Sequence, residues 1–271
     1  MNTTAVTPVI APIFGGFIQA WLGWRWNFAL LFIFALIIFG FWYFLFHETN
    51  KHQNKNSMSV SLVIKNYLII FNSPIFLKNA ICGGLIYSGE VVFLSVAPFL
   101  IQERLHFSAA VYGWILFLTV SGFILGARCS AILVQKFECK NLILIGLFTT
   151  LISSILMLIW NNVSNSSLLS TVTPMVFFMC GAGFVYSNTA VSAIGPFPEK
   201  AGVASALLSS LQGMVAASVG FLASQLHCDT ATDLALILVC LSFVSITLLL
   251  WGTIRISGRK SRKVFQWVQL E

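Results

Sequence analysis

Long uninterrupted stretches of apolar residues dominate the chain. Eight of them approach or exceed the ~20 residues that a helix needs to cross ~30 Å of hydrocarbon. They cover residues 5–22, 27–46, 76–101, 110–134, 142–160, 169–194, 203–226 and 232–253. In hydrocarbon every backbone amide must be hydrogen-bonded within the protein, and these stretches are too long for barrel strands. The pattern therefore predicts an all-α integral membrane protein with about eight transmembrane helices.

A polar stretch separates the second apolar run from the third. It begins at His47 with HETNKHQNKNSMS and continues into the weakly amphipathic segment VSLVIKNYLIIF. We interpret residues 47–75 as a linker that contains a surface-lying segment. Two predicted helices precede it and six follow, an uneven division for a transporter built from repeated halves. This division leads to the hypothesis that further helices belong upstream of Met1.

Composition agrees with a lipid environment. Hydrophobic residues make up 58% of the chain and charged residues only 8%, whereas soluble domains carry roughly a quarter charged residues. The net charge of +7 comes from Lys and Arg at the ends of apolar runs, so it does not predict nucleic-acid binding. Because the first 24 residues carry no charge, they lack the basic start of a cleavable signal peptide.

The same cations predict the orientation in the membrane. When the loops are assigned alternately to the two sides, all fifteen Lys and Arg except Arg25 and Arg104 fall on the side of the two termini. The positive-inside rule makes that side cytoplasmic. Residues 255–271 are then a basic cytoplasmic tail.

The sequence carries no signature of an enzyme or a metal site. Its six cysteines are dispersed and its four histidines fall in or beside loops, without the spacing of metal or redox ligands. Phosphate-binding loops, His-Glu-x-x-His and Gly-x-Ser-x-Gly are also lacking. We expect neither catalysis nor a bound cofactor.

The first apolar run contains a pattern that bends helices and brings them close together. Pro8 and Pro12 lie four residues apart, and Gly15 and Gly16 follow one turn later; prolines kink a helix and glycines admit a neighbour. A packing kink is one interpretation. The segment also resembles motif C in the fifth helix of major facilitator superfamily antiporters, although Ala11 replaces the usual glycine.

Two further segments resemble the bicyclomycin and chloramphenicol resistance (Bcr/CflA) subfamily of these drug:proton antiporters. FLSVAPFLIQERLHFSAAVYGWILFLTVSGFILGARCSAILVQKF is similar to helices seven and eight. GAGFVYSNTAVSAIGPFPEKAGVASALLSSLQ is similar to helices ten and eleven. Members of this family have twelve helices, and this chain would carry helices five to twelve.

The resemblance implies the domain organisation. Residues 1–46 correspond to the last two helices of the N-terminal half, 47–75 to the cytoplasmic linker, and 76–254 to the complete C-terminal half. The first four helices of the family pattern would lie upstream of Met1.

Glu90 is the one acidic residue well inside a predicted span. Because a carboxylate is costly in hydrocarbon, it is expected to face a cavity. One hypothesis makes Glu90 a proton or cationic-substrate site, and the alternative makes it a structural group at a helix interface.

Other polar and aromatic residues are candidates for the substrate and proton pathway. By resemblance, Asn188 and Gln212 lie on helices that line the second-half cavity, although hydrogen bonds between helices would account for them equally well. Tyr87, Phe93 and Tyr186 are candidates for an aromatic wall against a flat apolar molecule, and ordinary packing is the alternative for each.

Arg128 lies where the predicted helix at 110–134 meets the cytoplasm. The resemblance aligns it with a degenerate copy of the motif A gate. A snorkelling topology determinant is the alternative.

The resemblance implies efflux of drug-like apolar or cationic small molecules across the bacterial inner membrane, driven by the proton gradient. One alternative is a truncated, non-transporting remnant or half-protein that requires a separate polypeptide carrying the first four helices. Another is a structural or receptor-like membrane protein.

Overall fold

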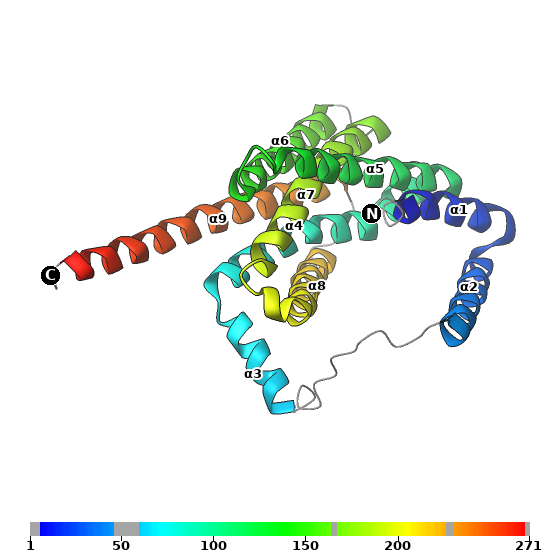
Figure 1. The fold of residues 1–271 in the computed structure, drawn as a ribbon. Coiled ribbons are helices and arrows are strands. Elements are labelled where there is room, and N and C mark those ends of the chain that lie inside the picture. Colours follow the sequence, from blue (N-terminus) through cyan, green and yellow to red (C-terminus); the bar gives the residue numbers. More distant parts are fainter. Residues whose placement is uncertain (1–5, 46–59, 164–166, 226–229, 269–271) are drawn as a thin grey trace.

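The computed structural model describes residues 6–45, 60–163, 167–225 and 230–268, with side chains described in 14–44, 64–163, 167–225 and 230–251. Every regular element in these ranges is a helix (Figure 1). The elements are α1 (Val6–Leu22), α2 (Trp24–Leu45), α3 (Val60–Phe71), α4 (Pro74–Pro98), the π-helical turn η2 (Phe99–Arg104), α5 (Ala109–Leu133), α6 (Cys139–Val163), α7 (Leu168–Ile194), the short turn η3 (Pro198–Lys200), α8 (Ala201–Gln225) and α9 (Ala231–Val268). The prediction of an all-α membrane protein is confirmed.

Seven of the described helices are long and apolar enough to cross a membrane. They correspond to the last seven of the eight predicted runs. The first run forms α1, whose 17 residues extend about 26 Å at 1.5 Å per residue. The last candidate span, Ala231–Trp251, lies in α9, whose backbone stays helical to Val268, so most of the predicted tail continues this helix.

Serine side chains fix where several helices begin. Ser73, Ser108 and Ser167 each precede a helix, and each hydroxyl accepts a hydrogen bond from the backbone amide three residues later. These caps satisfy amides that have no carbonyl partner in the first helical turn. Between α1 and α2 the turn is a single residue, Gly23, whose φ of +89° suits glycine.

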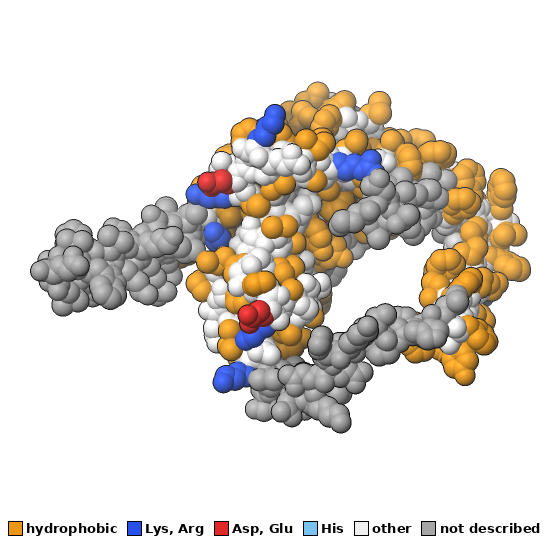
Figure 2. Space-filling model, in the orientation of Figure 1, with side chains coloured by type: hydrophobic (Ala, Val, Ile, Leu, Met, Phe, Trp, Pro, Cys, Tyr) orange, Lys and Arg blue, Asp and Glu red, His pale blue; other side chains and the backbone are white. Residues whose placement is uncertain are grey.

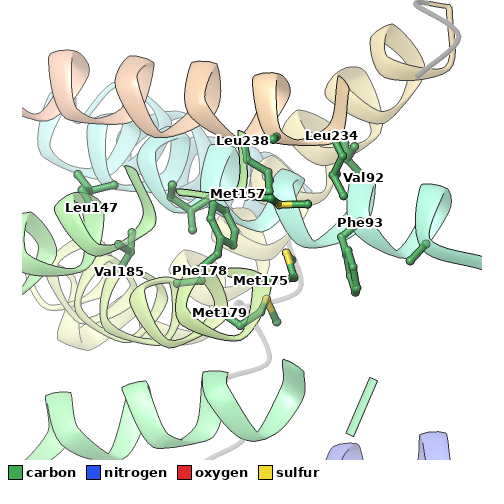
Figure 3. Close-up of a cluster of buried hydrophobic side chains, with 14 of the residues drawn as sticks. Val92, Phe93, Leu147, Met157, Met175, Phe178, Met179, Val185, Leu234 and Leu238 are labelled. Carbon is green, nitrogen blue, oxygen red and sulfur yellow. The ribbon is translucent and has the colours of Figure 1, made fainter. Parts of the chain in front are cut away.

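Helix α7 lies at the centre of the bundle. It packs against α4, α5 and α6 and is the most buried of the candidate spans. Its side chains Met175, Phe178 and Met179 meet Met157 of α6 and Leu238 of α9 in the main apolar core (Figure 3). Since lipid is as apolar as this core, van der Waals packing is what holds these helices together.

A second apolar cluster joins α3 and α8 to the bundle. Ile70 of α3 is fully buried and packs with Phe76 of α4, Ala193 of α7 and Leu208 of α8. The segment predicted to lie on the surface is therefore fixed to the bundle along one face.

The first two helices lie at the edge of the bundle. Helix α1 packs on α5, where a Cβ on Gly16 would stand 2.9 Å from the carbonyl oxygen of Ala109. Helix α2 packs mainly on α1 and stands away from the other helices (Figure 1). None of its described side chains is buried, so all its faces are open to lipid or to further helices.

Apolar side chains cover much of the visible surface in Figure 2. The Lys and Arg atoms in that view gather mainly toward the end of the molecule where Figure 1 places the C-terminus. This distribution is typical of a bundle whose cations mark one membrane face.

Glycines bring α5 and α7 into backbone contact. A Cβ on Gly122 would stand 2.5 Å from the carbonyl oxygen of Val176, and a Cβ on Gly126 would overlap the carbonyl oxygen of Cys180. From the other helix, a Cβ on Gly183 would overlap the carbonyl oxygen of Phe123. These residues form the glycine seam, which has the close approach that small residues give membrane helices.

A hydrogen bond between side chains also joins α5 and α7 beside the glycine seam. The side-chain amide of Asn188, which is 3% exposed, donates to the Ser130 hydroxyl of α5 at 2.6 Å and to the Phe184 carbonyl at 2.7 Å. Both amide hydrogens thus have acceptors. Asn188 therefore makes the kind of interhelical hydrogen bond named as one interpretation of its sequence position.

Gly126→Ala is expected to destabilise the protein, because the added methyl group must push α5 away from α7. We expect a loss on the order of 1–3 kcal/mol, as for other overpacked cores, seen as a lower melting temperature of the purified protein in detergent. The control is Gly40→Ala on α2, where an added Cβ meets nothing within 4 Å. An equal melting temperature for the two variants would contradict the glycine seam.

Asn188→Leu is expected to weaken the contact between α5 and α7. Interhelical hydrogen bonds in membranes contribute about 0.6–1.7 kcal/mol, so the melting temperature should fall measurably. Asn162→Leu is the matched control, because among the described residues that exposed amide bonds to Leu158 of its own helix alone. A stability of Asn188→Leu equal to that of the control would exclude a structural role.

Candidate functional site

Glu90 lies near the middle of the 31-residue span Pro74–Arg104. Its side chain is half-buried, and it makes no hydrogen bond or ion pair with another side chain in the described ranges. Gly83, Tyr87 and Glu90 are spaced four and three residues apart on α4, so they share one face of the helix. This face carries a carboxylate without a structural partner at mid-membrane depth.

An aromatic group stands beside the acid. The rings of Tyr87 and Tyr186 have centroids 6.3 Å apart, and Phe123 meets Tyr186 edge-on at 6.1 Å. Both tyrosines are 37% exposed, and Tyr186 lies near enough to Glu90 for an electrostatic interaction. Helices α4, α5 and α7 therefore present aromatic faces and one acid together on an open side of the bundle.

A close polar contact among α4, α7 and α8 lies one helical turn from the tyrosines. A Cβ on Gly83 would stand 2.7 Å from the Gln212 Nε2 and 2.8 Å from the Thr189 Oγ1. Gln212 is 3% exposed and Thr189 is fully buried. The Nε2 of Gln212 has no hydrogen-bond partner, and among the fully buried side-chain nitrogen and oxygen atoms of the described ranges only the Ser242 hydroxyl shares this condition.

The structure separates the remaining candidates from this group. Phe93 is 2% exposed and belongs to the main apolar core (Figure 3), where it packs instead of facing an open surface. Asn188 bonds across the glycine seam. Of the six candidates for the substrate and proton pathway, Glu90, Tyr87, Tyr186 and Gln212 are brought together.

The kink and gating candidates lie elsewhere in the bundle. Pro8 and Pro12 fall within helical backbone of α1, and their side chains are outside the described residues. Gly15 accepts a hydrogen bond at its carbonyl from the Asn27 amide of α2 at 3.4 Å, while Gly16 faces α5. These two glycines therefore pack α1 against its two neighbours.

Arg128 is exposed near the C-terminal end of α5. Its side chain makes no ion pair with an acid in the part of the chain that the structure describes. This position is compatible with a topology determinant and with a gate residue.

Two contributors to the site were missed in the sequence, namely Gly83 and Thr189. Gly83 has no side chain to attract notice, and a lone threonine in an apolar run is ordinary. Their importance comes from the crossing of α4, α7 and α8, which the pattern along one helix does not reveal. The Gly83-Gly84 pair was the available signal, since Gly84 lets the Gln212 backbone approach α4 to 3.3 Å from the position of an added Cβ.

Within the described ranges, no three His, Cys, Asp or Glu side chains are grouped to hold a metal ion. The chemistry available at the site is hydrogen bonding, aromatic contact and protonation of one carboxylate.

Comparison with known proteins agrees with the resemblance in the sequence. Residues 2–221 match the model of the Major Facilitator Superfamily. A bicyclomycin resistance protein homolog of Haemophilus influenzae is 21% identical over 84% of this chain and 57% of its own length. The multidrug resistance protein MdtL of a Shewanella strain is 25% identical, over 92% of this chain and 62% of its own.

A chloramphenicol resistance protein of Pseudomonas aeruginosa is 24% identical over 98% of this chain and 62% of its own length. The chain thus spans about three fifths of the length of these relatives. Its helical membrane bundle and the match over residues 2–221 lead to one conclusion: the chain belongs to the major facilitator superfamily.

Proposed function

We propose that this protein is a secondary active transporter that expels drug-like small molecules in exchange for protons. The observation that carries the proposal is Glu90, a half-buried acid near the middle of a span beside the Tyr87–Tyr186 pair. Relatives named for resistance to bicyclomycin, to chloramphenicol and to multiple drugs support the same activity. The substrates would be apolar or cationic molecules with a flat face.

The proposed mechanism assigns proton coupling to Glu90. The deprotonated carboxylate favours substrate binding against the aromatic group. A proton arriving from outside neutralises Glu90 and favours release of the substrate. Rocking of two helical bundles about this mid-membrane site gives alternating access, and the proton gradient supplies the energy.

We further propose that the protein lies in the bacterial inner membrane with both termini cytoplasmic. The support is the distribution of Lys and Arg, of which only Arg25 and Arg104 fall on the opposite side. A cation on the outer side is tolerated at Arg25, whose guanidinium lies 5.0 Å from the Trp24 ring centroid, at the depth where aromatic belts form.

The alternative is that this chain transports only together with helices that correspond to the rest of its relatives' length. Those helices would come from an upstream extension or from a separate polypeptide. The chain spans 57% to 62% of the length of those relatives. This partial coverage is the reason for the alternative.

Glu90→Gln is expected to abolish substrate-driven proton release while leaving the protein folded. Inside-out vesicles containing the native protein should lose an imposed proton gradient when ethidium or chloramphenicol is added, as read by a pH-sensitive dye. Vesicles with Glu90→Gln should respond as empty vesicles do, because the amide cannot exchange a proton. Glu103→Gln, at an exposed acid near the end of the same span, serves as the control; coupling that survives in Glu90→Gln would refute the assignment.

Cells expressing this chain with the upstream helices restored are expected to tolerate more chloramphenicol and to retain less ethidium than cells with an empty vector. Cells expressing the chain without the upstream helices distinguish independent transport from the half-protein hypothesis. Efflux by the chain alone would make the extra helices unnecessary, and efflux only in the restored form would support the half-protein hypothesis. No difference from the empty vector in either form would refute drug efflux.

A further inference from the structure

Two lysines from different helices come together beside α9. Lys78 is the fifth residue of α4, and Lys140 is the second residue of α6. Helix α9 packs on both α4 and α6, so it joins the two helices that carry these lysines. They belong to the end of the bundle where the Lys and Arg atoms gather (Figure 2).

The two ammonium groups repel each other without a compensating acid. They lie near enough for an electrostatic interaction, and Lys78 is half-buried whereas Lys140 is exposed. Within the described ranges neither forms an ion pair. Glu138, two residues before Lys140, is exposed and forms none either. Because like charges at close range are unfavourable, an anion that contacts both lysines would turn a repulsion into an attraction.

The chain adds more positive charge where α9 leaves its candidate span. Five of the nine residues 255–263 are Lys or Arg, and no acid occurs between Asp233 and Glu271. The backbone of α9 is helical through this segment to Val268. A concentration of one sign of charge raises the local concentration of the opposite ion, and a cluster of cations directly beyond a membrane helix attracts anionic lipids.

The position of the lysines favours a phosphate group that belongs to a lipid. Both lie at the end of a candidate span, which is the depth of lipid headgroups, and a headgroup on the protein surface needs exposed donors and not an enclosed cavity. The Lys ammonium is a compact charge with three donors, which suits phosphate oxygens. Beyond Lys140, α6 exposes the apolar side chains Ile145, Phe148 and Ile152, which offer a surface to acyl chains.

We propose that Lys78 and Lys140 form a binding site for the phosphate headgroup of an anionic phospholipid, whose acyl chains lie along the exposed apolar side of α6. A headgroup with two phosphates, as in cardiolipin, fits two lysines from two helices best. The bound lipid would relieve the repulsion and connect α4 with α6 beside α9. This inference does not depend on the transport function.

Lipid binding to the purified protein in neutral detergent tests the site. Native mass spectrometry would follow the binding of cardiolipin and of phosphatidylcholine, which has no net charge. In the double variant Lys78→Gln/Lys140→Gln, cardiolipin affinity should fall on the order of tenfold, and phosphatidylcholine binding should stay as in the native protein. The double variant Lys65→Gln/Lys200→Gln removes the same charge from α3 and η3 and should bind cardiolipin as the native protein does, because about 0.1 M salt screens distant charges.

Melting temperatures provide a second measurement. A ligand that binds the folded state stabilises it, so cardiolipin should raise the melting temperature of the native protein and of Lys78→Arg/Lys140→Arg, which keeps both charges. It should raise that of Lys78→Gln/Lys140→Gln much less. The single variant Lys140→Glu, at an exposed position, reverses one charge and should weaken cardiolipin binding even if the double variant does not fold.

Several results would overturn the proposal. An equal loss of cardiolipin in the two double Gln variants would indicate a general attraction instead of a site. Equal binding of cardiolipin and phosphatidylcholine, or no cardiolipin binding by the native protein, would exclude recognition of the phosphate. Displacement of cardiolipin by millimolar inorganic phosphate would show that the site takes a soluble anion and not a lipid.

Discussion

The absence of water from the hydrocarbon core is the constraint on which this structure depends. It forces backbone groups into helices and forces polar side chains to find partners inside the protein. Most of the buried hydroxyls find a partner within their own helix. For example, Ser88, Ser154 and Ser245 each donate a hydrogen bond to the carbonyl four residues earlier. Asn188 finds its partners on two helices, α5 and α7. Against this background, the few polar groups left without partners become the most informative ones.

The exclusion of water also separates apolar and polar side chains at the candidate site. Apolar packing of Met175, Phe178 and their neighbours forms the interior around α7, and the candidate polar groups of the site lie on the side shared by α4, α7 and α8. One acid, two tyrosines and one unpaired amide on that face come from three helices. Because each group lies on a rigid helix and not on a loop, their separation is set by helix packing.

Much of the fold was predictable because hydropathy directly reports the length of a membrane helix. The ends of the helices were less predictable. The apolar run 142–160 underestimates α6, which spans Cys139–Val163, since polar residues such as Asn161 and Asn162 remain helical at the membrane boundary. The start of α4 follows from Ser73 and Pro74, which are a capping residue and a proline that hydropathy alone does not weigh.

The candidate site was predictable only in part. Glu90 and Gln212 were identifiable because a charged or amide side chain is conspicuous in an apolar run. Phe93 and Tyr87 were not distinguishable, since only the packing of α4 decides that one faces the core and the other an open side. Thr189 and Gly83 required the three-dimensional crossing of helices.

The glycine seam has a mechanical consequence. Where carbonyl oxygens of α7 occupy the space of missing Cβ atoms on α5, neither helix can slide along the other without first separating from it, because the backbone of one is keyed into the other. We therefore expect α5 and α7 to move together as one rigid unit. Relative motion in this part of the bundle then falls to helices that pack on the pair less extensively, such as α8 against α7.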